Sequence, residues 1–204
     1  MTTGTVQARA ATNALLICGA LGKEVKAIVD AHNLEVDVFG IPAMHHFYPK
    51  KIVQAVEAKL QNLSHTYERV VVVYGDCGTA GALDPILERY GAVRLQGPHC
   101  YEIFAGPGFD RMMEEEPATF FLTDWLVRNF ERAVIRGLGL DRYPDLKQIY
   151  FGNYLKLIYL VQFPNEALIE KAQEIGEYLG LPLTTRFTGV EGLGSRLRHL
   201  LEVA

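Results

Sequence analysis

The chain has 204 residues, of which 49% are apolar and 22% charged, and its formal net charge is −4. This length is enough for one domain with a substantial core. Lysine and arginine are interspersed with acidic residues and form no basic cluster, which argues against a nucleic-acid-binding protein. No apolar run reaches the roughly 18–20 residues that span a bilayer, so we expect no membrane segment.

The first residues of the chain are polar and lack the apolar core of a signal peptide. We therefore expect residues 1–12 to be frayed or disordered and the protein to be cytoplasmic. Three cysteines are an odd number, which argues against a disulfide framework in such a protein. We expect residues 13–204 to form a single domain.

Strand-like and helix-like segments alternate along the chain. Apolar or alternating runs predict strands, and apolar residues at helical spacing predict helices. The densest β-branched run, 69–75, suits a strand in a sheet that is covered on both faces. Strands are expected at 14–19, 35–40, 69–75, 92–97, 118–123, 155–163 and 181–189. Helices are expected at 21–33, 49–63, 81–91, 124–139, 166–180 and 190–203, with a short helix in 98–117 that is broken at 106–108.

This alternation predicts an α/β protein with a mostly parallel, doubly wound sheet and helices on both faces. Ligands of such sheets bind beyond the carboxyl ends of the strands. All three cysteines fall at such ends, because Cys18 lies near the end of the first strand and Cys77 and Cys100 lie just past the third and fourth. We therefore expect the three thiols to face the same rim of the sheet.

Three convergent thiolates suit two kinds of metal site. Thiolates bind zinc tetrahedrally, and three of them leave the fourth position open for water or substrate. Three cysteines can also hold a four-iron cluster with one iron free for substrate. The chain lacks the CxxC spacing that is specific for such sites. A single nucleophilic or redox thiol, and inert packing of small buried residues, therefore remain as alternatives.

The turn around the second cysteine, YGDCGTAG, is rich in glycine and precedes a predicted helix. The backbone at Gly75, Gly78 and Thr79 is a candidate to bind an anion or cofactor, or to lower the pKa of Cys77. The turn matches neither the dinucleotide fingerprint nor the phosphate-binding P-loop.

Four side chains close to the cysteines in sequence are candidates for proton transfer or for orienting the metal ligands. They are Tyr74, Asp76, His99 and Glu102. Asp76 is more typical of a turn or helix cap than of an acid/base group, whereas His99 is equally typical of an exposed loop.

Two further pairs of residues follow predicted strands. His45 and His46 are neighbours in a loop, where successive side chains point apart, so at most one of them is expected to face the site. Asp124 is expected to cap the helix 124–139, and Trp125, the only tryptophan, is expected in the core.

Several motifs occur in order along the chain: ICGAL, VVVYGDCG, GPHCYEIFAG, ATFFLTDWL and YFGNYLKLIYL. Through them the chain resembles, over about residues 15–197, the domain-of-unknown-function family 1638 of bacteria and methanogenic archaea. That family has a cysteine after the first strand, a YGxCG motif after the central strand and a third cysteine that introduces a helix. These positions correspond to Cys18, Cys77 and Cys100, whereas His99 stands where the family more usually has aspartate.

The resemblance implies no established activity. Members of the family are often encoded near corrinoid-dependent methyl-transfer proteins, so the resemblance implies a role in one-carbon metabolism with a corrinoid or a methyl-transfer protein as partner. If the protein is an enzyme, we expect a metal-dependent transferase acting on a small molecule, and a homo-oligomer is compatible with this. The alternative is a non-catalytic module that binds a small molecule, a corrinoid or a partner protein, with the cysteines as packing residues.

Overall fold

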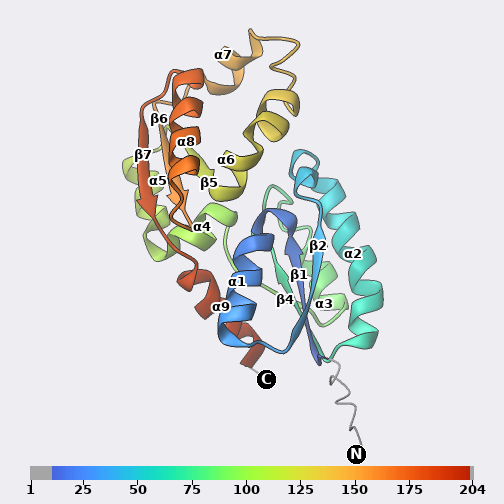
Figure 1. The fold of residues 1–204 in the computed structure, drawn as a ribbon. Coiled ribbons are helices and arrows are strands. Elements are labelled where there is room, and N and C mark those ends of the chain that lie inside the picture. Colours follow the sequence, from blue (N-terminus) through green and yellow to red (C-terminus); the bar gives the residue numbers. More distant parts are fainter. Residues whose placement is uncertain (1–10, 203–204) are drawn as a thin grey trace, which may run out of the picture.

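The computed structural model describes residues 11–202. The predicted frayed segment therefore lies almost wholly outside the described residues, as does the last residue of the predicted helix 190–203. Parallel strands and helices alternate throughout, which confirms the predicted α/β class. The strands, however, form two parallel sheets, where the sequence suggested one (Figure 1).

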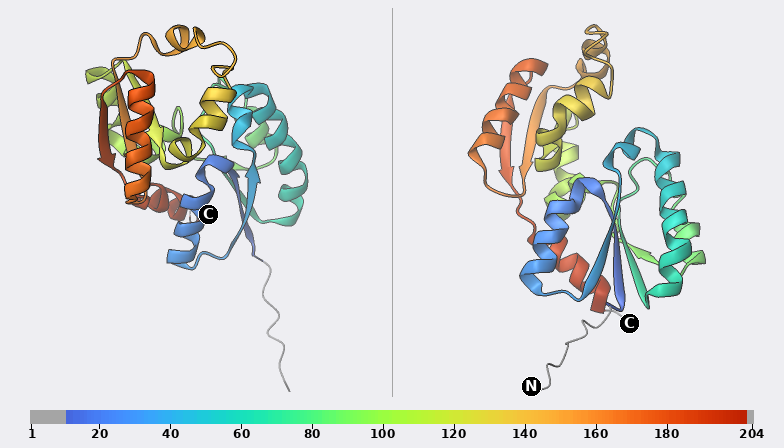
Figure 2. Two further views of the ribbon diagram at one scale, coloured as in Figure 1. Left: turned by 45° about the horizontal axis from the view of Figure 1, so that its top comes forward. Right: turned by 45° about the vertical axis from the view of Figure 1, so that its right-hand side comes forward.

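The first sheet has the strand order β2-β1-β3-β4, and all of its strands are parallel. Helices α1 and α9 cover one face of this sheet and α2 and α3 cover the other (Figures 1 and 2). Its strands are β1 (Asn13–Cys18), β2 (Val36–Ile41), β3 (Arg69–Val73) and β4 (Val93–Arg94). Its helices are α1 (Gly22–His32), α2 (Pro49–Thr66), α3 (Asp84–Arg89) and α9 (Glu191–Glu202).

Residue types explain the first sheet. In β3 the valines Val70–Val73 are at most 3% exposed, because helices cover this central strand on both sides. Helix α2 begins at Pro49, which lacks only an N–H group that the first turn of a helix does not use. Apolar residues at helical spacing turn one side of α2 towards the sheet, namely Ile52, Val56, Leu60 and Leu63.

The second sheet has the order β5-β6-β7 and is also parallel. Its strands are β5 (Thr119–Thr123), β6 (Lys156–Val161) and β7 (Leu183–Phe187). The associated helices are α4 (Cys100–Ala105), α5 (Phe109–Glu115), α6 (Asp124–Phe130), α7 (Leu146–Phe151) and α8 (Glu166–Leu179). Helix α6 passes directly into a π-helix, Glu131–Arg136, within the span predicted as one helix.

Alternation along β5 and β6 gives the second sheet two apolar faces. Successive residues of a strand point to opposite faces. Phe121, Ile158 and Leu160 pack with residues of α4 and α5. Their neighbours Leu122 and Tyr159 pack with residues of α6 and α8.

The chain then returns to the first sheet. Helix α9 follows β7 and lies beside α1, where its Leu193 and Leu197 join the core of the first sheet (Figure 1). The chain therefore passes from the first sheet to the second after β4, and α9 brings it back to the core of the first sheet.

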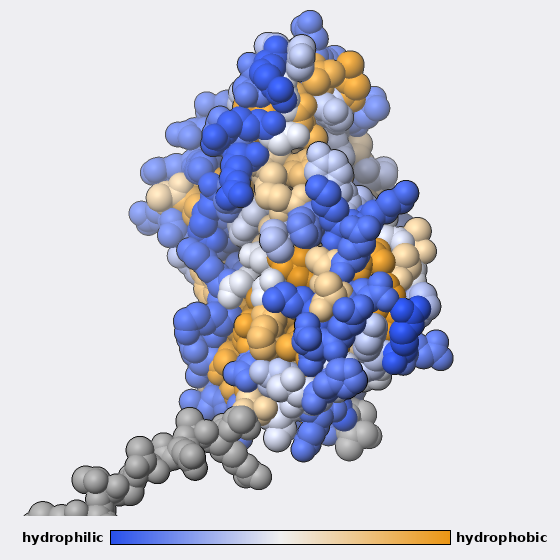
Figure 3. Space-filling view, turned by 90° about the vertical axis from the view of Figure 1, so that its right-hand side faces the viewer, coloured by the Kyte–Doolittle hydropathy of each residue, from blue (hydrophilic) through white to orange (hydrophobic). Residues whose placement is uncertain are grey.

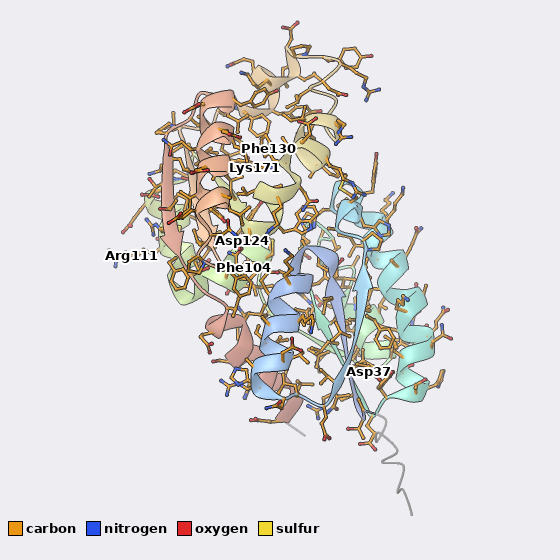
Figure 4. All side chains as sticks on the ribbon, in the orientation of Figure 1. Asp37, Phe104, Arg111, Asp124, Phe130 and Lys171 are labelled. Atoms are coloured by element: carbon orange, nitrogen blue, oxygen red, sulfur yellow. The ribbon has the colours of Figure 1, made fainter. Side chains whose placement is uncertain are left out.

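A buried carboxylate fixes the carboxyl ends of β5 and β6. Asp124, labelled in Figure 4, is the first residue of α6. It is 0% exposed and accepts four hydrogen bonds. The donors are the Tyr159 hydroxyl, the backbone N–H groups of Gln162 and Phe163, and the Arg128 guanidinium. The prediction that Asp124 caps its helix is wrong, because the Thr123 hydroxyl accepts the N–H of Leu126 instead.

Hydrophilic residues cover most of the face that carries α2 (Figure 3). None of the helices described within residues 11–202 is both long and apolar enough to cross a bilayer.

Candidate functional site

The three cysteines lie at the ends of neighbouring elements. Cys18 is the last residue of β1, Cys77 lies in the turn after the adjacent strand β3, and Cys100 begins α4. Cys18 and Cys77 are buried and Cys100 is partly buried. In each pair of these thiols, the charge of one raises the pKa of the other. The three sulfur atoms are therefore close enough to interact electrostatically.

The three thiols are not positioned in this structure to bind one metal ion together. Within the described part of the chain, no group of three or more His, Cys, Asp or Glu side chains is arranged to hold a metal ion.

The loops that carry Cys77 and Cys100 are joined through their backbones. The N–H of Asp76 donates to the carbonyl of Gly97 at 2.9 Å, and the N–H of Cys77 donates to the carbonyl of Pro98 at 2.8 Å. Gly75 makes this approach possible, because a Cβ atom there would lie 2.7 Å from Cα of His99.

The turn that follows is organised by Asp76. Its carboxylate accepts hydrogen bonds from the backbone N–H groups of Gly81 (2.8 Å) and Ala80 (3.1 Å) and from the Thr79 hydroxyl (3.0 Å). These bonds, that of Gly81 most strongly, lower the pKa of Asp76. The amides of Ala80 and Gly81 therefore bind a side chain of the turn itself, and the amide of Thr79, one of the candidates for an external anion, donates to the backbone carbonyl of Asp76. Gly78, with φ +79°, provides the left-handed conformation that the turn requires.

Polar groups beside the three sulfur atoms favour their thiolate forms. The Tyr74 hydroxyl and the backbone of Ala20 act on the pKa of Cys18 in this direction, and the backbone of Gly75 and Cys100 acts on the pKa of Cys77. The backbone at Cys100 and Tyr101, at the start of α4, does the same for the pKa of Cys100. Such groups place positive partial charge next to the sulfur.

Burial nevertheless dominates the acidity of the thiols. It raises the pKa of Cys18, Cys77 and Cys100, and that of Cys77 to about 12. The prediction that the glycine-rich turn lowers the Cys77 pKa is therefore wrong, since loss of solvent outweighs the backbone hydrogen bonds.

The side chains beside Cys100 have different environments. The ring of His99 packs edge-on against Tyr101 and Phe109, with ring centroids 5.2 and 5.1 Å apart, and burial lowers its pKa. Its Nδ1 atom is buried and has no hydrogen-bond partner among the described residues. Glu102 instead accepts two hydrogen bonds, of 3.1 and 3.2 Å, from Nη1 of Arg196 in α9.

A cavity of about 240 Å³ lies between the two sheets, beside Cys100. Its wall includes Cys100 and His46, and five aromatic residues contributed by distant parts of the sequence. These aromatic residues are Phe47, Tyr101, Phe120, Trp125 and Phe151. The sequence did not reveal this cavity, and Trp125 lies half-buried in its wall rather than in the core.

The two adjacent histidines differ in position. His46 lines the cavity, and His45 is not among the lining residues described. Burial of the imidazole, and to a smaller degree the nearby His99, lowers the pKa of His46.

Comparison with known proteins gives one family. A family model described as "Protein of unknown function (DUF1638)" matches residues 41–197, which include Cys77 and Cys100 and begin after Cys18. A search of curated proteins found no match. Since the matched residues make up more than half of the sequence, the chain belongs to DUF1638, the family that its motifs indicated.

Proposed function

We propose that Cys18, Cys77 and Cys100 together bind a zinc ion or an iron–sulfur cluster. In this proposal the protein acts in the transfer of a small group, such as methyl, with a small molecule as substrate and a corrinoid or a methyl-transfer protein as partner. One observation carries the proposal: three thiols from three separate elements lie at one rim within electrostatic range of one another.

The donor chemistry fits a soft metal. Polar groups beside each sulfur favour its thiolate form. Burial opposes three thiolates without a cation, and the positive charge of a metal would offset that penalty as the thiols lose their protons. Free thiols also suit the reducing conditions of the cytoplasm, where we place the protein. The loops of Cys77 and Cys100 already share backbone hydrogen bonds, which hold two of the three cysteine-bearing segments together.

When bound, such a metal would supply an open coordination position at which substrate can be activated. We assign His99 to proton transfer, because burial favours its neutral imidazole and its Nδ1 atom has no partner in the described part of the chain. Tyr74 orients Cys18 through its hydrogen bond. Asp76 positions the Cys77 turn, and Glu102 positions the loop before α4 through Arg196.

The glycine-rich turn serves the same arrangement. Gly75 allows the two cysteine loops to approach, and Gly78 and Thr79 close the turn around Cys77. Their proposed contribution to cofactor binding is therefore to shape the backbone around the thiol.

The metal content and absorption spectrum of protein purified without oxygen test the proposal. We expect either about one equivalent of zinc or the brown colour of an iron–sulfur cluster. The metal should be lost in Cys77→Ala and retained in Ser195→Ala, which changes an exposed residue of α9.

Metal-free wild-type protein, with unchanged stability in all three single Cys→Ala variants, would overturn the proposal. It would leave the alternative of a non-catalytic binding module with the cysteines as packing residues.

A further inference from the structure

We propose that the cavity between the two sheets binds a neutral, predominantly apolar molecule built on one substituted aromatic ring. The inference rests on the proposed function, since this molecule would be the substrate presented to the three-cysteine site. It goes beyond that function by assigning a location and a chemical class to the ligand.

The size of the cavity sets the size of the ligand. An apolar cavity of about 150 Å³ accepts benzene. The cavity of about 240 Å³ therefore has room for one ring and a substituent of a few atoms. Aromatic walls favour a ring, because offset or edge-on aromatic contacts add to the free energy of apolar burial.

The lining residues also limit the charge of the ligand. None of the described residues in the wall is Asp, Glu, Lys or Arg. Apart from Cys100 and Tyr101, the only titratable lining residue is His46. A charged ligand would lose its hydration without gaining an oppositely charged partner, which is costly. A neutral ligand avoids this cost.

The position of the cavity links it to the cysteine rim. Its wall contains Ala20, just after β1, and Thr123, the last residue of β5, so it lies at the carboxyl ends of strands from both sheets. In such sheets this is the edge at which ligands bind. Cys100 belongs both to the wall and to the three thiols, so a bound ring would lie beside the proposed metal site.

Fluorescence of Trp125 provides the test. Trp125 is the only tryptophan of the chain and lies in the cavity wall, so a change in its emission reports on this site alone. Three probes with the same ring and different charge should be titrated into wild-type protein: anisole, benzoate and phenyltrimethylammonium. We expect anisole to change the emission saturably, and benzoate and phenyltrimethylammonium to bind at least about tenfold more weakly.

A cavity-filling variant and a matched control locate the binding. Ala43 lines the cavity, whereas Ala58 is exposed on α2. Ala43→Leu should abolish the response to anisole, and Ala58→Leu should preserve it. Circular dichroism of both variants verifies that they are folded.

The inference is overturned if anisole gives no saturable response in the wild type, or if either charged probe binds as tightly as anisole. Binding of phenyltrimethylammonium as tight as that of anisole would identify the cavity as an aromatic site for cations instead. Repeating the titration in Cys77→Ala separates this inference from the proposed function, because Cys77 is not among the described lining residues. That variant should lose metal and still bind anisole, so failure of either claim is recognised independently.

Discussion

Replacing Asp124 with alanine is expected to lower the free energy of unfolding by about 3–5 kcal/mol. The carboxylate is fully buried, and its removal leaves the Tyr159 hydroxyl, two backbone N–H groups and the Arg128 guanidinium without their acceptor. These groups connect α6 to the carboxyl end of β6, so the loss affects the second sheet where its strands and helices meet. Urea denaturation of wild type and variant measures the difference.

Two further variants show whether the buried network is the cause. Asp124→Asn keeps the shape and one acceptor oxygen, so we expect a smaller loss than with alanine. Asp30→Ala removes an exposed carboxylate whose contact is a 2.6 Å ion pair with Lys26 one helical turn away. It should change stability by no more than about 0.5 kcal/mol. A loss in Asp124→Ala as small as that in Asp30→Ala would show that the network adds little.

Replacing Gly75 with alanine is expected to destabilise the protein by about 3 kcal/mol and to separate the two cysteine loops. The new Cβ atom would lie 2.7 Å from Cα and 2.8 Å from the backbone nitrogen of His99. Both neighbours are backbone atoms, so no side-chain rotation relieves the clash, and the loop that leads to Cys100 must move. Chemical denaturation measures the stability, and metal content reports the consequence for the thiols, which we expect to be loss of binding.

Gly22→Ala is the matched control for this substitution. Gly22 has helical torsions of φ −61° and ψ −39°, and a Cβ atom there would meet nothing within 4 Å. Alanine should therefore be neutral or stabilise α1 by up to about 1 kcal/mol, with full metal binding. Equal behaviour of the two variants would mean that the close approach at Gly75 is unimportant.

The local structure could be predicted because it depends on local patterns. The valines of β3 and the apolar spacing of α2 each specify an element without reference to distant residues. The division into two sheets could not be predicted in this way. Val93 and Arg94 pair with β3 whereas Thr119–Thr123 pair with β6, and nothing in these short segments encodes which neighbour each will have.

In the candidate site, only the positions of the cysteines relative to the strands were predictable from local patterns. The cysteines follow predicted strands, and ligands bind at the carboxyl ends of parallel strands. Together these two points predicted that the thiols face one rim. The aromatic cavity was not predictable, since Phe47 and Phe151 lie far apart in the sequence and come together only through the tertiary structure. The role of Asp124 was missed for a similar reason, because Tyr159 and Phe163 reach it from a strand end far away in the sequence.

The central claim, that three thiols share one metal, is tested most directly by X-ray absorption spectroscopy at the zinc edge of the zinc-loaded protein. The spectrum reports the number and kind of atoms bound to the metal. We predict a shell of three sulfur atoms at about 2.3 Å in the wild type, and loss of this shell together with the bound zinc in each of Cys18→Ala, Cys77→Ala and Cys100→Ala. A shell of nitrogen and oxygen alone, or a sulfur shell that none of these substitutions changes, would contradict the account.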